Sequence, residues 1–354
     1  MQYFKVKNLS LIIIISVIFF IIFNLLVVIT WPIYSSLKAN THSYIDEQKE
    51  LLQLSEKQLV TLNNETWRNY DKFRFVPFVG HTETDRVGKL VNFSEKDGRY
   101  VQRPNECKRN IYLYGGSTAF GYNVTDNQTI GYYLQNLFNE DACVYNHGRA
   151  YFYSKQENNL FINHLENKKI ISDALFLDGI NERCGGYEYM NHINNSFNLL
   201  VERPYKMWKI SLNNFIKTLP VVQLANTLTS SDRWIQDNNN NILSIESCVS
   251  NIELNYLYQE RVSVRDGICN KKNINCFSFL QPMAGTSGRQ INKLLKKEIS
   301  ETLQNKYNIL KKANGIIDLK SILDNDSDLS YIDGVHYSPK TNKIIAEELF
   351  KYLN

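Results

Sequence analysis

Residues 111–121 read Ile-Tyr-Leu-Tyr-Gly-Gly-Ser-Thr-Ala-Phe-Gly, a pattern that predicts a strand, a turn and the start of a helix. The first four residues predict a short buried strand, and the glycine pair predicts a tight turn out of it. Ser117 then opens a predicted helix, where the turn exposes its hydroxyl and the free N–H groups of the helix N-terminus suit an oxyanion. Gly-Gly-Ser alone is often only a turn, so its meaning depends on the rest of the chain.

The alternation of short apolar runs and helical segments continues toward the C-terminus. Strands are predicted at 111–114, 143–146, 173–178, 276–281 and 315–319, and helices at about 128–139, 154–167, 245–265, 289–312 and 340–353. Such alternation indicates an α/β fold with a parallel sheet covered on both faces. In these sheets, ligands bind at the carboxyl ends of the strands.

Polar residues with chemical potential follow several of these strands. Gly148 follows the second run in Asn146-His-Gly148, and it has no Cβ to block approach to its N–H. Asn181 follows the third run with a neutral amide donor. Asp333 and His336 share a loop near the C-terminus, so the carboxylate can hold the imidazole while the imidazole faces the serine. We expect all of them at one edge of the sheet.

Four blocks follow one another along the chain: Ser117 in the first, Asn146-x-Gly148 in the second, Gly179-x-Asn181 in the third and Asp333-x-x-His336 in the last. In this order they resemble the SGNH (GDSL-type) hydrolase superfamily over about residues 108–182 and 274–354. The Gly-Gly-Ser-Thr block is similar to a membrane-anchored branch of it. The resemblance implies a flavodoxin-like three-layer sandwich with a central parallel sheet. Two positions depart from the usual pattern: Gly116 replaces the acidic residue before the serine, and Glu182 replaces the Asp after the third-block asparagine. Neither is a triad or oxyanion residue, so catalysis is not excluded.

The resemblance and the residue types imply the same chemistry. Ser117 would attack an ester carbonyl, His336 would take its proton, and Asp333 would orient His336. The Ser117 N–H, the Gly148 N–H and the Asn181 side chain would receive the oxyanion. The acyl-serine would pass to water in an esterase or to a sugar hydroxyl in an acyltransferase, and the sequence leaves this choice open. No metal or organic cofactor is implied.

Other polar residues beside these blocks have structural interpretations. His147 is better explained as a neighbouring-loop histidine than as a residue lining the site. Arg149 fits either an anionic substrate or a structural ion pair. Asp178 and Glu182 could be read as paired glycosidase carboxylates, but their spacing around a strand end favours support of the Asn181 loop.

The N-terminal segment is unlike the rest of the chain, because no charged residue occurs between Asn8 and Leu37. Its apolar core of about 22 residues is long enough for a helix that spans a bilayer, and longer than a cleaved signal peptide requires. Lys5 and Lys7 precede it, which favours a cytoplasmic N-terminus and an outward-facing remainder. The predicted order is a cytoplasmic tail (1–8), a transmembrane anchor (9–31), a stalk and loop-rich lead-in (32–107), and a hydrolase-like domain (108–354) with an insertion at about 185–242.

All six cysteines follow the predicted anchor, none in a Cys-x-x-Cys pair. An even number in an oxidising compartment suggests disulfides, and we predict Cys107–Cys143, Cys184–Cys248 and Cys269–Cys276, with buried free thiols as the alternative. The net charge of +4 over 354 residues argues against a nucleic-acid binder.

These observations favour a membrane-anchored, outward-facing serine esterase or O-acyltransferase acting on acyl esters of glycans, O-acetyl groups in particular. The glycan substrate rests on location and family analogy. Two alternatives stay open. One is a lipid esterase of the same fold, and the other is a non-catalytic module that binds glycan or protein; the intact set of Ser117, Asp333 and His336 argues against the second. A structural anchor acting through residues 185–242 is a weaker possibility.

Overall fold

The structure is a computed structural model that describes residues 11, 14–28, 30, 48–66, 73–183, 219, 251–290, 297–326 and 328–354. The chain divides into two compact units, one of Met1–Tyr44 with Gly186–Asn241 and the other of Ile45–Gly185 with Ile242–Asn354. The first unit contains few described residues, mainly the helical stretch 14–28. The second unit contains all the predicted site residues.

Within the described ranges, none of the helices combines the length and apolar character needed to cross a bilayer. Parts of the predicted anchor at 9–31 lie outside those ranges, so the anchor stays a prediction. Apart from residue 219, the predicted insertion at about 185–242 also lies outside the described residues. The predicted Cys184–Cys248 pair lies outside them as well.

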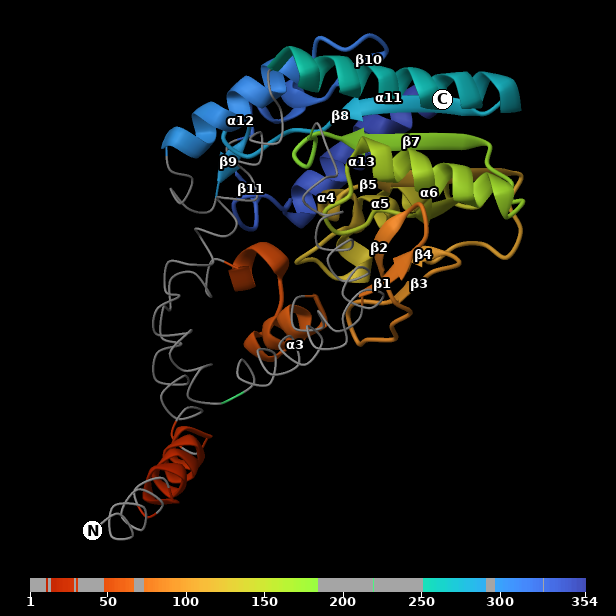
Figure 1. Ribbon diagram of the computed structural model, residues 1–354. Coiled ribbons are helices and arrows are strands. Elements are labelled where there is room, and N and C mark those ends of the chain that lie inside the picture. Colours follow the sequence, from red (N-terminus) through yellow and green to blue (C-terminus); the bar gives the residue numbers. More distant parts are fainter. Residues whose placement is uncertain are drawn as a thin grey trace. The chain divides into compact units, whose positions relative to one another are not determined.

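The core of the second unit is a seven-stranded sheet in the order β10-β8-β7-β5-β6-β4-β3 (Figure 1). Its parallel strands are β5 (Arg109–Gly115), β6 (Ala142–Asn146), β7 (Asp173–Asp178), β8 (Asn275–Leu280) and β10 (Ile316–Asp318). Numbered along the chain, these five stand in the order 2-1-3-4-5, which is the flavodoxin-like arrangement. The predicted parallel sheet is therefore confirmed.

Two very short strands extend the sheet beyond β6. β4 (Gly98–Arg99) pairs antiparallel with β6, and β3 (Phe93–Ser94) pairs antiparallel with β4. The sheet is consequently mixed, a feature that the alternating pattern of the later chain does not predict.

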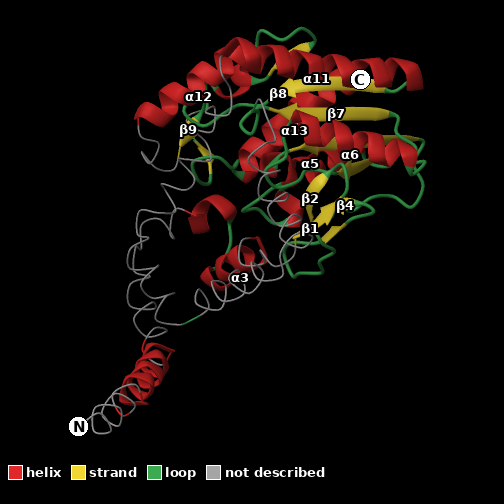
Figure 2. Ribbon diagram, viewed as in Figure 1, coloured by secondary structure: helices red, strands yellow, loops and turns green. Residues whose placement is uncertain are grey.

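Helices cover both faces of the sheet (Figure 2). Ile111 and Leu113 of β5 point to one face and pack with α5 (Ile130–Phe138) and α13 (Pro339–Leu353). Tyr112 and Tyr114 point to the other face, whose apolar cluster includes residues of α6 (Ser154–Glu166) and α11 (Asn251–Lys272). This alternation follows from the two-residue period of a strand, because successive side chains leave opposite faces.

The segment before β5 packs on the α/β core. Leu52 and Leu62, the latter in α3 (Glu56–Thr66), share an apolar cluster with Val91, Val124 and Ile332. The described part of the predicted stalk, residues 48–66, is therefore helical and lies on the domain. A hairpin of β1 (Phe73–Val76) and β2 (Gly80–Glu83) follows it.

Two predicted helices, at about 245–265 and 289–312, have different bounds in the structure. α11 runs on to Lys272, directly before β8. Residues 289–290, expected to begin a helix, instead form β9, which pairs in parallel with β11 (Leu329–Tyr331). The described helix there is α12 (Lys297–Leu310).

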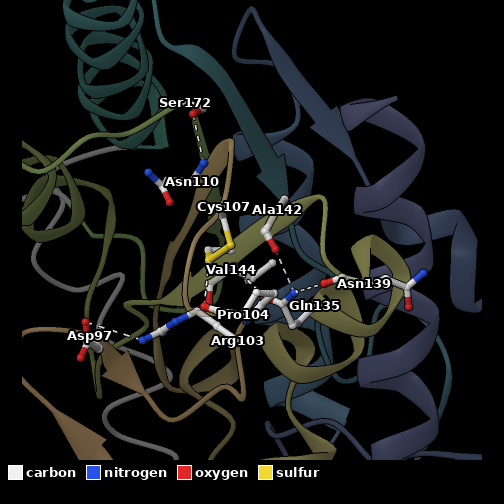
Figure 3. Close-up of a disulfide and its surroundings, with 11 residues drawn as sticks. Asp97, Arg103, Pro104, Cys107, Asn110, Gln135, Asn139, Ala142, Val144 and Ser172 are labelled. Carbon is white, nitrogen blue, oxygen red and sulfur yellow. Dashed lines mark hydrogen bonds and ion pairs between the residues drawn. A yellow bond between two sulfur atoms is a disulfide. The ribbon is translucent and has the colours of Figure 1, made fainter.

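Two of the predicted disulfides are present. Cys107–Cys143 joins the segment before β5 to the start of β6 (Figure 3), and Cys269–Cys276 joins the end of α11 to the start of β8. Both bonds lie near the amino ends of parallel strands. They are therefore at the opposite edge of the sheet from the predicted site.

Candidate active site

Ser117 lies at the carboxyl end of β5, as predicted. It is the first residue of α4 (Ser117–Phe120), a single turn that ends at Gly121 in a left-handed conformation. The side chain stays partly exposed while Thr118, Ala119 and Phe120 after it are buried. A residue at the first position of a helix has no intrahelical acceptor for its N–H. The local fold thus presents both a hydroxyl and a backbone donor at the edge of the sheet.

The structure brings Ser117, His336 and Asp333 together. His336 Nε2 lies 3.0 Å from Ser117 Oγ, and His336 Nδ1 lies 2.8 Å from Asp333 Oδ2. The side chains of His336 and Asp333 are each 8% exposed, so the pair is largely shielded from water. This chain of contacts is the arrangement of a nucleophile, a general base and a residue that orients the base.

The loop that carries Asp333 and His336 is held tightly at its base. The Ile332 N–H donates to the His336 carbonyl at 2.8 Å, and both flanking residues, Tyr331 and Tyr337, are buried in the main core. Asp333 Oδ1 accepts the backbone N–H groups of Val335 and His336, each at 2.7 Å. The carboxylate is thereby fixed by its own loop before it meets the imidazole.

The charged form of Asp333 is favoured in this position. Burial acts to raise the pKa of the carboxyl, but the His336 imidazole and the hydrogen bonds from the His336 and Val335 backbone outweigh it and leave the pKa below its usual value. Asp333 therefore remains an acceptor for His336 at neutral pH.

Asn123 and Tyr122 complete the surroundings of the triad, and sequence reasoning did not identify either. The Asn123 amide donates to Asp333 Oδ2 at 2.6 Å, and the Tyr122 ring stacks on the His336 imidazole with centroids 5.8 Å apart. Asn123 has a φ of 64°, a left-handed conformation that asparagine tolerates better than most residues. An asparagine soon after the Ser117 turn is the one signal that could have suggested it.

Gly148 packs directly against the helical turn that carries the serine. A Cβ on Gly148 would lie 2.3 Å from the Phe120 backbone nitrogen, so only glycine fits. The Asn146 side chain links Gly148 to this turn. Its amide donates to the Ala119 carbonyl at 2.8 Å, and its oxygen accepts the Gly148 N–H at 3.1 Å. The Gly148 N–H, the predicted oxyanion donor, is thus already paired with Asn146, and an oxyanion would have to share it.

Asn181 lies beside the residue that precedes the serine. A Cβ on Gly116 would stand 2.4 Å from Asn181 Nδ2, so a larger residue here would displace the Asn181 amide from its present position. Asn181 Nδ2 donates one hydrogen bond, to the Phe152 carbonyl at 2.9 Å. An amide nitrogen has two donor hydrogens, so one remains for a ligand as far as the described residues show.

His147 and Arg149 face away from the site into the protein interior. His147 is fully buried; it stacks on Tyr112 with ring centroids 5.2 Å apart and meets His164 at a tilt with ring centroids 4.2 Å apart. Arg149 is buried with its Nε 3.9 Å from Glu83 Oε2, and its burial lowers the pKa of its guanidinium to about 10. Of the two interpretations of Arg149, the structure supports the structural ion pair.

Asp178 and Glu182 have structural partners in α11 and α6. Asp178 accepts hydrogen bonds from Arg265 at 2.8 Å and Tyr258 at 3.0 Å. Glu182 accepts the Ser154 N–H and hydroxyl, both at 2.7 Å. These contacts fix both ends of the Gly179–Glu182 turn that carries Asn181. They agree with the prediction that Asp178 and Glu182 support the Asn181 loop.

No protein-family model and no curated protein matches the chain. The chain is similar to solved structures at low identity. The acetyl xylan esterase AlAXEase is 10% identical with a TM-score of 0.36, and the match covers 69% of this chain and 100% of that one. A carbohydrate acetylesterase family member from Sinorhizobium meliloti is 12% identical (TM-score 0.37; 69% and 97% covered). A member of the lipolytic protein G-D-S-L family from Veillonella parvula is also 12% identical (TM-score 0.33; 69% and 97% covered).

The Veillonella parvula protein belongs to a G-D-S-L family, the type that the four sequence blocks resemble. All three TM-scores lie below 0.5, so this likeness alone assigns no function to the chain. In this chain, a serine, a histidine, an aspartate and candidate oxyanion donors lie at the carboxyl ends of the parallel strands of a flavodoxin-like sheet.

Proposed function

We propose that the protein is a membrane-anchored serine esterase that forms an acyl-enzyme on Ser117. The observation that carries the proposal is the continuous contact from Ser117 Oγ through His336 to Asp333, with distances of 3.0 and 2.8 Å. A module that only binds a ligand would have no need of a buried carboxylate aligned behind an imidazole that faces a serine.

Each step of the reaction has a residue to perform it. As Ser117 Oγ attacks the ester carbonyl, its proton moves to His336 Nε2, and the anionic Asp333 stabilises the imidazolium. The oxyanion is received by the Ser117 N–H and the Asn181 amide, with the Gly148 N–H shared from Asn146. His336 then gives the proton to the leaving alcohol, and water releases the acyl group by the reverse sequence of transfers.

We further propose that the acyl esters are O-acetyl groups on a glycan outside the cytoplasmic membrane. The support is the predicted anchor at 9–31, which would hold the domain beside the cell envelope, and the two predicted disulfides that form. If a sugar hydroxyl replaces water at the second step, the same residues perform an O-acyl transfer. A lipid esterase is the competing proposal, supported only by closeness to the bilayer.

The test uses the full chain purified in detergent under oxidising conditions. Wild type is expected to hydrolyse 4-nitrophenyl acetate and to be labelled by a fluorophosphonate, and both signals should be lost in Ser117→Ala. Ser263→Ala serves as the matched control, because Ser263 is an exposed serine on α11. A folded wild type with neither signal would overturn the esterase proposal.

A substrate series separates the remaining choices. Release of acetate from acetylated oligosaccharide, with little action on 4-nitrophenyl palmitate, is expected for the glycan enzyme, and the reverse preference would favour the lipid esterase. Transfer of the acetyl group to added sugar, seen as a new acetylated product, would identify the acyltransferase. Extraction of the protein from membranes by alkaline carbonate would contradict the anchor.

A further inference from the structure

Lys306 is a buried lysine that the proposed chemistry does not use. It belongs to α12 and is 3% exposed. Its neighbours in that helix, Leu303, Tyr307 and Leu310, belong to the apolar cluster between α12, α11 and the sheet. Lysine is almost never fully buried unless it is paired. Its presence here requires a reason other than packing.

The ammonium group has one partner, and that partner is next to the site. Lys306 Nζ donates to the Ile180 carbonyl at 2.7 Å. Within the described ranges, no carboxylate lies at ion-pair distance from Nζ. The charge of Glu182 acts on Lys306, but the contacts of the Glu182 carboxylate are with Ser154 and Arg261. A hydrogen bond to one carbonyl does not offset the loss of hydration of a cation.

Burial accordingly acts against the charged form. It lowers the pKa of Lys306 to about 8, with Glu182 opposing the shift and Arg183 adding to it. A methionine would fill nearly the same space in this apolar cluster without that cost. The chain thus keeps a lysine at a position where an apolar residue would be at least as stable.

The carbonyl that Lys306 holds belongs to the turn that presents Asn181. The turn is closed by the Glu182 N–H, which donates to the Gly179 carbonyl at 2.9 Å. Asp178 and Glu182 are fixed at its two ends, and among the described residues Ile180, in the middle, is held by packing and by Lys306. Asn181 directly follows Ile180, and its side-chain amide lies beside Gly116.

We propose that Lys306 is a positioning residue that fixes the Ile180 carbonyl and so holds the Asn181 amide in place to receive the oxyanion. This inference rests on the proposed esterase function. The lysine does not touch the substrate; it acts through the peptide group that precedes Asn181.

The test compares Lys306→Met with Lys311→Met in the full chain. Lys311 is an exposed lysine just beyond the end of α12, so its replacement controls for the loss of a charge from this region. With 4-nitrophenyl acetate, Lys306→Met is expected to lower kcat about 10- to 100-fold with KM changed less than twofold, because only transition-state stabilisation is lost. Lys311→Met should match wild type.

Two further readouts distinguish positioning from a structural role. The melting temperature of Lys306→Met should equal or exceed that of wild type, because an unpaired buried charge is removed. Hydrogen–deuterium exchange should become faster in peptides that contain residues 179–182, and only in that variant. If Lys306→Met does not fold, Lys306→Gln, which loses the charge and the reach, is measured in the same way.

The outcomes separate this inference from the proposed function. Wild-type kcat and unchanged exchange in the folded variant would overturn the inference, as would a large fall in melting temperature with unchanged exchange. If wild type neither hydrolyses nor is labelled, the esterase proposal fails. The exchange of residues 179–182 still decides in that case whether Lys306 holds the turn.

Discussion

Asn123 donates its side-chain amide to Asp333 Oδ2 at 2.6 Å, the same oxygen that pairs with the His336 imidazole. The segment after the nucleophile is thereby joined to the acidic residue of the triad, across 210 positions of sequence. Within the described residues, Asp333 accepts four hydrogen bonds from three residues, and Asn123 is the one of these three that lies outside the Asp333 loop.

We predict that Asn123→Gly lowers kcat about tenfold. Glycine accepts the φ of 64° without strain, so the variant keeps the backbone conformation and loses the side-chain hydrogen bond to the carboxylate. Asn139→Gly is the matched control, because Asn139 also has a positive φ, of 51°, at the exposed end of α5. Steady-state kinetics with 4-nitrophenyl acetate provides the measurement. Equal kcat in the two variants would show that Asn123 does not support the triad.

Gly116→Ala should impair the oxyanion site rather than the fold. The added Cβ would stand 2.4 Å from Asn181 Nδ2, so the flexible amide must move away. Loss of one oxyanion donor typically lowers kcat about 10²–10³-fold. Gly267→Ala is the control, because nothing lies within 4 Å of its new Cβ on α11. The control should keep full activity and gain about 0.5–1 kcal/mol of stability. An active Gly116→Ala enzyme would argue against Asn181 as a donor.

Acid should destabilise the fold below about pH 6.5 through two buried histidines. Burial, reinforced by nearby cations, lowers the pKa of His164 to about 3 and that of His147 far below its usual value. The unfolded chain binds protons at these histidines near pH 6.5 while the folded chain does not, so the free energy of unfolding falls as the pH falls. Each histidine should account for about 2 kcal/mol between pH 7 and pH 5.

Urea unfolding at pH 5, 6 and 7 measures this dependence. His147→Phe should reduce this pH dependence by the share of one histidine, because phenylalanine can replace the imidazole between the Tyr112 and His164 rings without a titrating group. An unchanged dependence on pH in His147→Phe would contradict the expectation.

The two disulfides should differ in their contribution to stability. Cys107–Cys143 spans 36 residues and Cys269–Cys276 spans 7. The loop-closure relation gives about 4 kcal/mol for the longer loop and about 2 kcal/mol for the shorter one. Double serine variants of each pair, compared by urea unfolding, test the order. A greater loss from the Cys269–Cys276 variant would mean that contacts of the folded state, rather than loop length, dominate.

The parallel sheet and the triad could be predicted because their signals are local. Each parallel strand is a short apolar run, and each candidate residue stands directly after one of them. The two-residue strand β4 has no such run. It contains Arg99, fully buried and paired with Asp126 at 2.8 Å, where a charged residue would be expected at the surface.

Contacts between distant segments could not be predicted in this way. Asn123 meets Asp333, and Lys306 meets Ile180, only because the sheet order places their segments side by side. Lys306 looks in the sequence like one of several polar residues of an amphipathic helix. Its burial depends on α12 packing against α11 and the sheet, and no spacing within α12 records that packing.

The Ser117–His336 hydrogen bond joins residues 219 positions apart, and this separation has a consequence for biosynthesis. A ribosome makes the nucleophile long before it makes the base, so a nascent chain carries an unreactive serine for most of its synthesis. Asp333 and His336 arrive together, immediately before the final helix α13, which packs against α5. A product that stops before residue 333, or loses its tail to a protease, has a serine hydroxyl with nothing to activate it. The segment that carries Asp333 and His336 therefore completes the triad late in synthesis.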